Sequence, residues 1–127
     1  DKMPSELSGG MRKRAGLARA MALEPSLLLF DEPSAGLDPV TGRELDAVIL
    51  DLKKMGSMGI VVVSHELGSI NTIADRAIML ADGRVLASGT LDVVRANPDP
   101  GLQASFKREA LTAHDRTDLL ADLEQPA

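Results

Sequence analysis

The chain has 127 residues, of which 44% are hydrophobic and 26% are charged, a balance typical of one folded globular domain and not of a disordered or fibrous protein. The net charge is −5 and the chain has no Trp or Tyr, so nothing in its composition favours nucleic acid as a partner. With no Cys and two His, disulfides, thiolate zinc sites and His-rich metal sites are excluded.

A helix and a buried strand are predicted first. Ser8 is a preferred N-cap residue, and a helical stretch over 11–23 follows it until Glu-Pro at 24–25 ends it. The continuous apolar run 27–30 then leads into Asp-Glu-Pro at 31–33. Such a run is typical of a strand that is buried on both faces.

A second helix and strand follow the same order. Asp38 before a proline is a strong helix start, and the helical spacing of apolar residues over 40–55 predicts an amphipathic helix. A second buried strand is predicted over 60–63, and a helix over about 67–74. Strands alternating with helices indicate an α/β fold with a parallel sheet, whose chemistry lies past the carboxyl ends of the strands.

The last part of the domain reads as a hairpin and two helices. Strands over 77–80 and 85–87 flank an Asp-Gly turn, and Thr90 is placed to cap a short helix. A rigid turn at 97–101 precedes another helical stretch.

The helical pattern weakens after Leu111. Residues 113–127 hold four acids and one Arg with little apolar content, so we expect a domain at 1–112 followed by an acidic tail. Disorder is one interpretation of this tail. The other is that Leu119, Leu120 and Leu123 dock on a partner subunit.

Three short segments could carry chemistry. Asp31 and Glu32 end a strand and point to opposite faces, so one could hold Mg²⁺ while the other polarises a water for attack on a phosphoryl group. Ser8 and two glycines before a helix could bind an anion, and His65 follows the second strand. Each segment alone also fits an ordinary strand end, helix cap or surface histidine.

The order and spacing of these segments along the chain are more specific than any one segment alone. Leu-Ser-Gly-Gly at 7–10, Asp-Glu-Pro at 31–33, Gly-Leu-Asp at 36–38 and Ser-His at 64–65 together resemble the ATP-binding-cassette (ABC) ATPases, up to about Leu111. In that family Leu7 to Met11 would be the signature motif and Leu27 to Glu32 the Walker B strand. Ala35 to Asp38 would be the D-loop, and His65 the switch histidine.

The resemblance implies ATP and Mg²⁺ as cofactors and a set of site residues. Glu32 would position the attacking water, His65 would contact the γ-phosphate, and Asp31 would help to hold Mg²⁺. The residues implied for nucleotide binding are Ser8, Gly9, Gly10, Met11 and Asp38, the signature residues acting on the nucleotide of the opposite protomer. Met11 stands where the family usually has Gln.

The Met11 variant, with the segments 18–25 and 96–100, is similar to the ATPase subunits of Mla-type phospholipid transporters. That resemblance implies a head-to-tail dimer with a second ATPase subunit, transmembrane permease subunits as partners, and no nucleic acid. It also implies a cytoplasmic location, peripheral on the inner membrane of a Gram-negative bacterium.

No G-x-x-x-x-G-K-[ST] phosphate loop occurs in the 127 residues, and the chain opens at Asp1 without an initiator Met. We therefore expect the C-terminal half of a P-loop ATPase domain, which alone neither binds ATP tightly nor hydrolyses it. One alternative is a non-catalytic interaction module that keeps the fold. Another is a non-transport ABC ATPase acting on DNA or ribosomes, which the acidic charge and the scarcity of aromatic residues for base stacking disfavour.

Overall fold

The computed structural model describes the backbone of residues 3–123, together with the side chains of residue 3 and residues 5–111. The chain divides into two compact units, Asp1–Ile73 and Ala74–Ala127. Each unit has its own cluster of buried apolar side chains.

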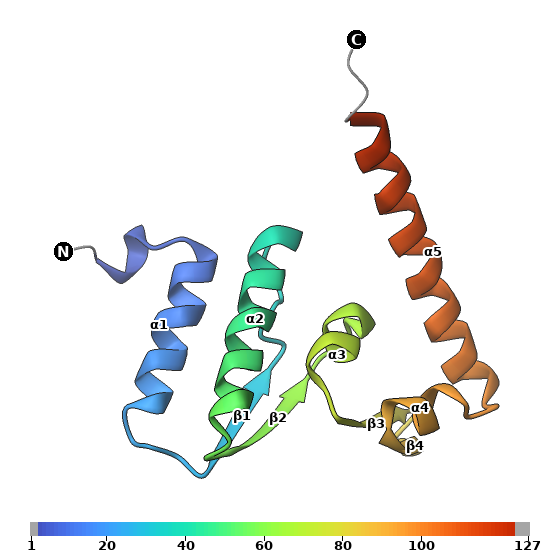
Figure 1. Cartoon of the computed structure of the whole chain (residues 1–127), viewed down its shortest axis with the longest axis horizontal. Coiled ribbons are helices and arrows are strands. Elements are labelled where there is room, and N and C mark those ends of the chain that lie inside the picture. Colours follow the sequence, from blue (N-terminus) through green and yellow to red (C-terminus); the bar gives the residue numbers. More distant parts are fainter. Residues whose placement is uncertain (1–2, 124–127) are drawn as a thin grey trace. The chain divides into compact units, whose positions relative to one another are not determined.

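The first unit alternates helices and strands (Figure 1). Its elements are η1 (Pro4–Glu6), α1 (Gly9–Met21), β1 (Leu27–Asp31), α2 (Pro39–Met55), β2 (Gly59–Val63) and α3 (Leu67–Ile73). Ser8 and Asp38 are the N-caps of α1 and α2, as their positions before helical stretches predict. Gly56 ends α2 with a positive φ of 67°, a conformation that favours glycine.

The two strands of this unit are parallel and in register. Leu27 lies opposite Gly59 at one end, and Asp31 lies opposite Val63 at the other. The core on one face of the pair consists of buried side chains of α2 and α3, packed against inward-facing strand residues: Leu45, Ile49, Ile73, Phe30, Ile60 and Val62. Because the carboxyl ends of the strands coincide, the segments that follow β1 and β2 lie next to each other.

The prediction that both strands are buried on both faces was wrong for the described residues. Leu29 is 72% exposed and Val63 is 57% exposed, and both lie on the face away from α2 and α3. Side chains alternate between the two faces of a strand, and among the described residues the helices cover one of them. The apolar runs identified the strands correctly but overestimated their burial.

The second unit is a hairpin with two helices. Its elements are β3 (Arg76–Ala81), β4 (Arg84–Thr90), α4 (Leu91–Arg95) and α5 (Pro100–Leu123). The antiparallel strands turn at Asp82 and Gly83, whose φ values of 49° and 70° are those of the predicted Asp-Gly turn. Thr90 caps α4, and the core is formed by Ala87, Val94 and Leu102.

Helix α5 is longer than its sequence pattern indicates. The pattern weakens after Leu111, but the helical backbone continues to Leu123. The side chains of Leu119, Leu120 and Leu123, and residues 124–127, lie outside the described residues, so the two interpretations of the tail stay open. Neither α5 nor any other helix in the described part of the chain has the length and apolar character to cross a membrane.

The predicted α/β class is confirmed. A parallel strand pair has helices packed on it, and a hairpin follows it in the chain. The residues predicted to carry chemistry lie in the first unit, at the carboxyl ends of β1 and β2 and at the start of α1 and α2.

Candidate active site

Glu32 and His65 form a contact at the carboxyl ends of the parallel strands. Glu32 follows β1 directly, and His65 lies two residues after β2. The His65 Nδ1 atom is 2.9 Å from the Glu32 Oε2 atom. The Glu32 side chain is 34% exposed and that of His65 is 76% exposed, so both groups remain accessible to a ligand or a water molecule.

This contact changes the electrostatics of the imidazole. The hydrogen bond to Glu32 and the negative charge of that carboxylate raise the pKa of His65 above its ordinary value of 6.5. The charged imidazolium is therefore the form that Glu32 stabilises.

The backbone of Glu32 has an unusual conformation. Its φ of 44° lies in the left-handed region, which is uncommon for a residue other than glycine. The Glu32 N–H donates to the Val63 carbonyl oxygen at 2.8 Å, and the Ala35 N–H donates to the Glu32 carbonyl oxygen at 3.1 Å. These two hydrogen bonds connect the Glu32 peptide to β2 and to the turn after β1.

Asp31 is the candidate metal ligand at this edge. It is the last residue of β1, and its side chain is exposed. Among the described residues, no three or more acidic or histidine side chains are grouped so that they could hold a metal ion. Mg²⁺ is commonly held by one or two carboxylates with waters and phosphate oxygens, so Asp31 fits the role of a single protein ligand.

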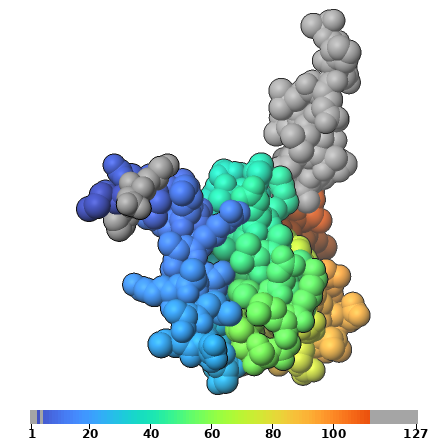
Figure 2. Space-filling model, turned by 60° about the vertical axis from the view of Figure 1, so that its left-hand side comes forward, coloured from blue at the N-terminus to red at the C-terminus, as the bar shows by residue number. Residues whose placement is uncertain are grey.

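The Ser-Gly-Gly-Met segment starts α1. The Ser8 Oγ atom accepts a hydrogen bond from the Met11 N–H at 3.2 Å, and Met11 is 46% exposed. A Cβ added at Gly10 would lie 2.5 Å from Thr41 Cγ2, so only glycine allows α1 to approach α2 this closely. Helix α1 lies against α2, as the neighbouring blue and teal parts of Figure 2 show.

Asp38 is fully engaged as a helix cap. Its Oδ1 atom accepts from the Val40 N–H at 3.1 Å and the Thr41 N–H at 3.0 Å, while the Thr41 hydroxyl donates to Oδ2 at 2.5 Å. The hydrogen bonds with Thr41 lower the pKa of Asp38. Thr41 thus contacts both Asp38 and Gly10.

The structure brings some of the predicted site residues together and leaves others apart. Glu32 and His65 meet, with Asp31 next to Glu32 in the chain. The described structure shows no hydrogen bond that joins the Ser8–Met11 segment to Glu32 or His65.

Sequence reasoning missed two residues near the site. Thr41 is one, and the other is Lys13, whose Nζ atom donates to the Glu32 carbonyl oxygen at 3.4 Å. Lys13 lies one helical turn after Gly9, a spacing that places both on one face of α1 and could have drawn attention to it.

A family model and two curated relatives all associate this chain with ATP-binding proteins of transporters. The family model described as ABC transporter matches residues 1–35. The chain is 51% identical over 98 residues to the intermembrane phospholipid transport system ATP-binding protein MlaF of Escherichia coli K12, covering 77% of the chain and 36% of MlaF. It is 39% identical over 111 residues to the methionine import ATP-binding protein MetN of Staphylococcus saprophyticus, covering 87% of the chain and 33% of MetN.

Solved structures agree with these relatives. MJ1267, an ATP-binding cassette of an ABC transporter, superposes with a TM-score of 0.71 at 25% identity, covering 84% of the chain and 42% of the cassette. The dimeric bacterial ABC transporter cassette MJ0796 gives a TM-score of 0.62 at 33% identity, covering 72% of the chain and 39% of the cassette.

The chain spans about a third of the length of the curated relatives that it matches. These matches confirm the family resemblance and the predicted fold class. The chain belongs to the ATP-binding domains of ABC transporters, and it comprises part of such a domain.

Proposed function

We propose that this chain is part of an ATP-hydrolysing subunit that powers an ABC transporter. The observation that carries the proposal is the Glu32–His65 contact of 2.9 Å at the carboxyl ends of two parallel strands, with Asp31 beside it. A carboxylate, an imidazole and an exposed aspartate at one sheet edge are the groups that phosphoryl transfer to water needs for positioning and charge stabilisation.

Each of the three side chains has a proposed role. Glu32 accepts a hydrogen bond from the attacking water and orients it, and its 34% exposure leaves room for that water. His65 donates a hydrogen bond to a phosphate oxygen, a role that the raised pKa favours because it keeps a donor proton on the ring. Asp31 holds Mg²⁺, which when bound neutralises charge on the phosphates.

The remaining site residues are proposed to act across a dimer. The start of α1 offers backbone N–H groups and the Ser8 cap to an anion, so Ser8, Gly9, Gly10 and Met11 are assigned to the nucleotide of a second ATPase subunit. The dimeric state of MJ0796 supports such a partner. In this proposal Asp38 acts through the cap that it forms, and permease subunits hold the protein on the cytoplasmic face of the inner membrane.

The transported substrate is proposed to be phospholipid. The identity to MlaF is 51%, against 39% to MetN, although the match to MetN extends over more of the chain. Met11 in place of Gln in the signature is the residue that supports the Mla-type assignment.

Titration of the 127-residue chain with MgATP by calorimetry tests the prediction made for the chain alone. We expect no saturable binding at micromolar concentrations, because the sequence contains no phosphate loop and the signature residues act on a second subunit's nucleotide. Saturable micromolar binding would overturn this prediction and reveal a phosphate site that the sequence analysis missed.

A chimera tests the proposed function directly. The matched 98-residue segment of E. coli MlaF is replaced by the corresponding residues of this chain, and ATP hydrolysis and phospholipid transport are measured. We expect both activities, and loss of turnover with Glu32→Gln. A parallel chimera with MetN serves as the control for substrate. If the MetN chimera were active and the MlaF chimera were not, the phospholipid assignment would be contradicted.

A further inference from the structure

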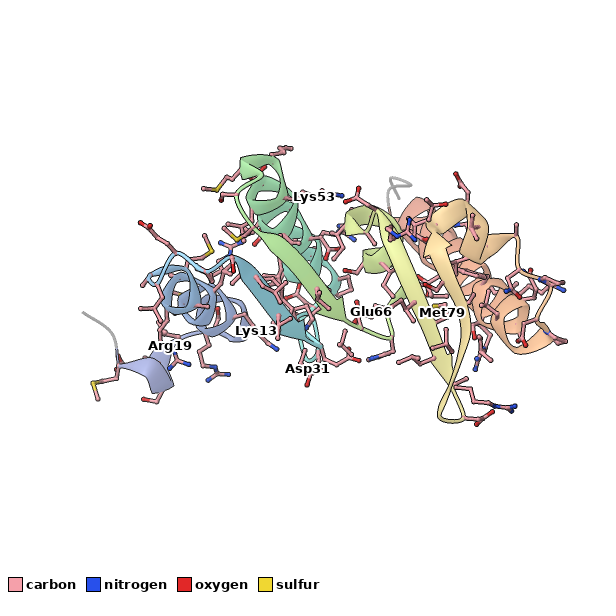
Figure 3. The ribbon with its side chains drawn as sticks, turned by 90° about the horizontal axis from the view of Figure 1, so that it is seen from below. Lys13, Arg19, Asp31, Lys53, Glu66 and Met79 are labelled. Carbon is pink, nitrogen blue, oxygen red and sulfur yellow. The ribbon has the colours of Figure 1, made fainter. Side chains whose placement is uncertain are left out.

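The Glu32 carbonyl oxygen has a second hydrogen-bond donor besides the turn that follows it. The Ala35 N–H donates at 3.1 Å from within the turn, and the Lys13 ammonium donates at 3.4 Å from α1, nineteen positions away in the chain. Lys13 is half-buried. Figure 3 shows its side chain reaching from α1 toward the end of β1, where Asp31 lies.

The conformation of Glu32 explains why a second donor matters. A non-glycine residue with φ of 44° is strained, so surrounding contacts must hold it in place. The peptide before Glu32 is fixed to Val63 by a hydrogen bond of 2.8 Å. Lys13 and Ala35 fix the peptide after it, and the side chain between the two peptides then meets His65.

Lys13 lies on the face of α1 that borders two hollows in the surface. Together with Gly16 it lines two separate hollows, one of about 210 Å³ beside Phe30 and Asp31, and one of about 450 Å³ beside Gly9 and Gly36. The neighbouring Arg14 instead pairs with Glu44 of α2 in an exposed ion pair of 2.7 Å. Lys13 therefore connects the helix of the signature motif to the backbone of Glu32.

We propose that Lys13 is a positioning residue for Glu32: it reaches from α1 to hold the Glu32 carbonyl group, so that the carboxylate is aimed at His65. The proposal rests on the function proposed above for Glu32, because the orientation of the carboxylate affects the reaction only if Glu32 orients the attacking water. It makes the direction of that carboxylate depend on where α1 lies.

The test compares three variants of the 127-residue chain. Lys13→Met keeps the unbranched apolar stem of the side chain but removes the donor, and Lys13→Arg keeps a donor. Arg19→Met is the matched control, because it removes a positive charge from an exposed position in the last turn of the same helix. Should Lys13→Met not fold, Lys13→Leu replaces it, since leucine also has no donor.

The readout is the pKa of His65, measured by NMR titration with His114 as the second histidine in the same spectrum. Removing a nearby positive charge would by itself raise the pKa of an imidazole, whereas loss of the Glu32 contact lowers it. We expect Lys13→Met to lower the pKa of His65 toward its ordinary value, and Lys13→Arg and Arg19→Met to leave it raised. An unchanged or higher pKa of His65 in Lys13→Met would overturn the proposal.

This measurement needs no ATP, so its outcome is separate from that of the proposed function. In the active MlaF chimera, Lys13→Met is expected to lower kcat by about 100-fold while KM for ATP stays the same, because a displaced carboxylate orients water poorly. Lys13→Arg is expected to restore kcat. A loss confined to KM would contradict a positioning role even if the chimera hydrolyses ATP.

Discussion

At the scale of single residues, the contact between Glu32 and His65 makes the stability of the fold depend on pH. The pKa of His65 is raised in the folded state, so the stabilisation is fully present below the ordinary pKa of 6.5 and is lost as the pH rises through the folded-state value. The contact therefore favours the folded state in mildly acidic solution and contributes least in alkaline solution.

We expect Glu32→Gln to lower the free energy of unfolding more at about pH 6 than at about pH 9, because the lost interaction involves the imidazolium. Urea unfolding at the two pH values measures this difference. Glu66→Gln is the control, since Glu66 has only the smallest influence on the pKa of His65. Equal effects of Glu32→Gln at both pH values would show that the contact is not charge-dependent in solution.

A second prediction at this scale concerns Gly10. A methyl group at Gly10 would lie 2.5 Å from Thr41 Cγ2, and Thr41 cannot turn away easily because its hydroxyl is bonded to Asp38. Gly10→Ala should therefore destabilise the fold by about 1–3 kcal/mol in urea unfolding.

Gly16→Ala provides the comparison within the same helix. Nothing lies within 4 Å of the position that its Cβ would take, so it should stabilise the fold by about 0.5–1 kcal/mol. If both alanine variants had the same effect, close packing at Gly10 would not be the reason for glycine there.

At the scale of elements, a buried polar contact joins α2 to α3. The Ser69 hydroxyl donates to the Asp46 Oδ1 atom at 2.5 Å, and the two residues are only 8% exposed. α3 begins two residues after His65, so this contact also determines where the histidine loop is held.

Ser69→Ala should cost about 1–3 kcal/mol, because it removes a donor from a buried carboxylate. Thr72→Ala is the matched control on the same helix, since Thr72 is exposed and its hydroxyl bonds within α3, and its effect should stay within about 0.5 kcal/mol. Urea unfolding compares the two. An effect of Ser69→Ala as small as that of Thr72→Ala would mean that water replaces the hydroxyl.

The sequence predicts best what is decided within a few residues. Ser8, Asp38 and Thr90 all act as the helix caps expected of them, because capping needs only the next three N–H groups. The place of Glu32 and His65 at one sheet edge also follows from parallel pairing. The contact of Lys13 with Glu32 joins residues nineteen positions apart, and no local pattern determines such a distance.

At the scale of the whole molecule, the two units have separate cores. Leu102 is 1% exposed and belongs to the cluster with Ala87 and Val94, whereas Ile49 is 2% exposed and belongs to the cluster of the first unit. Each cluster can therefore be weakened by a substitution of its own.

Leu102→Ala should destabilise the second unit by about 2–5 kcal/mol through lost burial and the cavity left behind. Hydrogen exchange measured by NMR should show faster exchange for β3 and β4 amides and unchanged exchange for β2. Ile49→Ala should give the opposite pattern. Equal loss of protection in both units with either variant would show that the two cores unfold as one.

The left-handed backbone at Glu32 sets the stability of the fold against the proposed activity at a single position. Glycine would adopt a φ of 44° without steric cost, so a library of variants selected for folding alone should rank glycine above glutamate at position 32. In the chimera with MlaF, a library selected for ATP turnover should reverse that order. Position 32 would then be a place where a thermostability screen removes the chemistry that the fold supports, and engineering of this domain should leave it untouched.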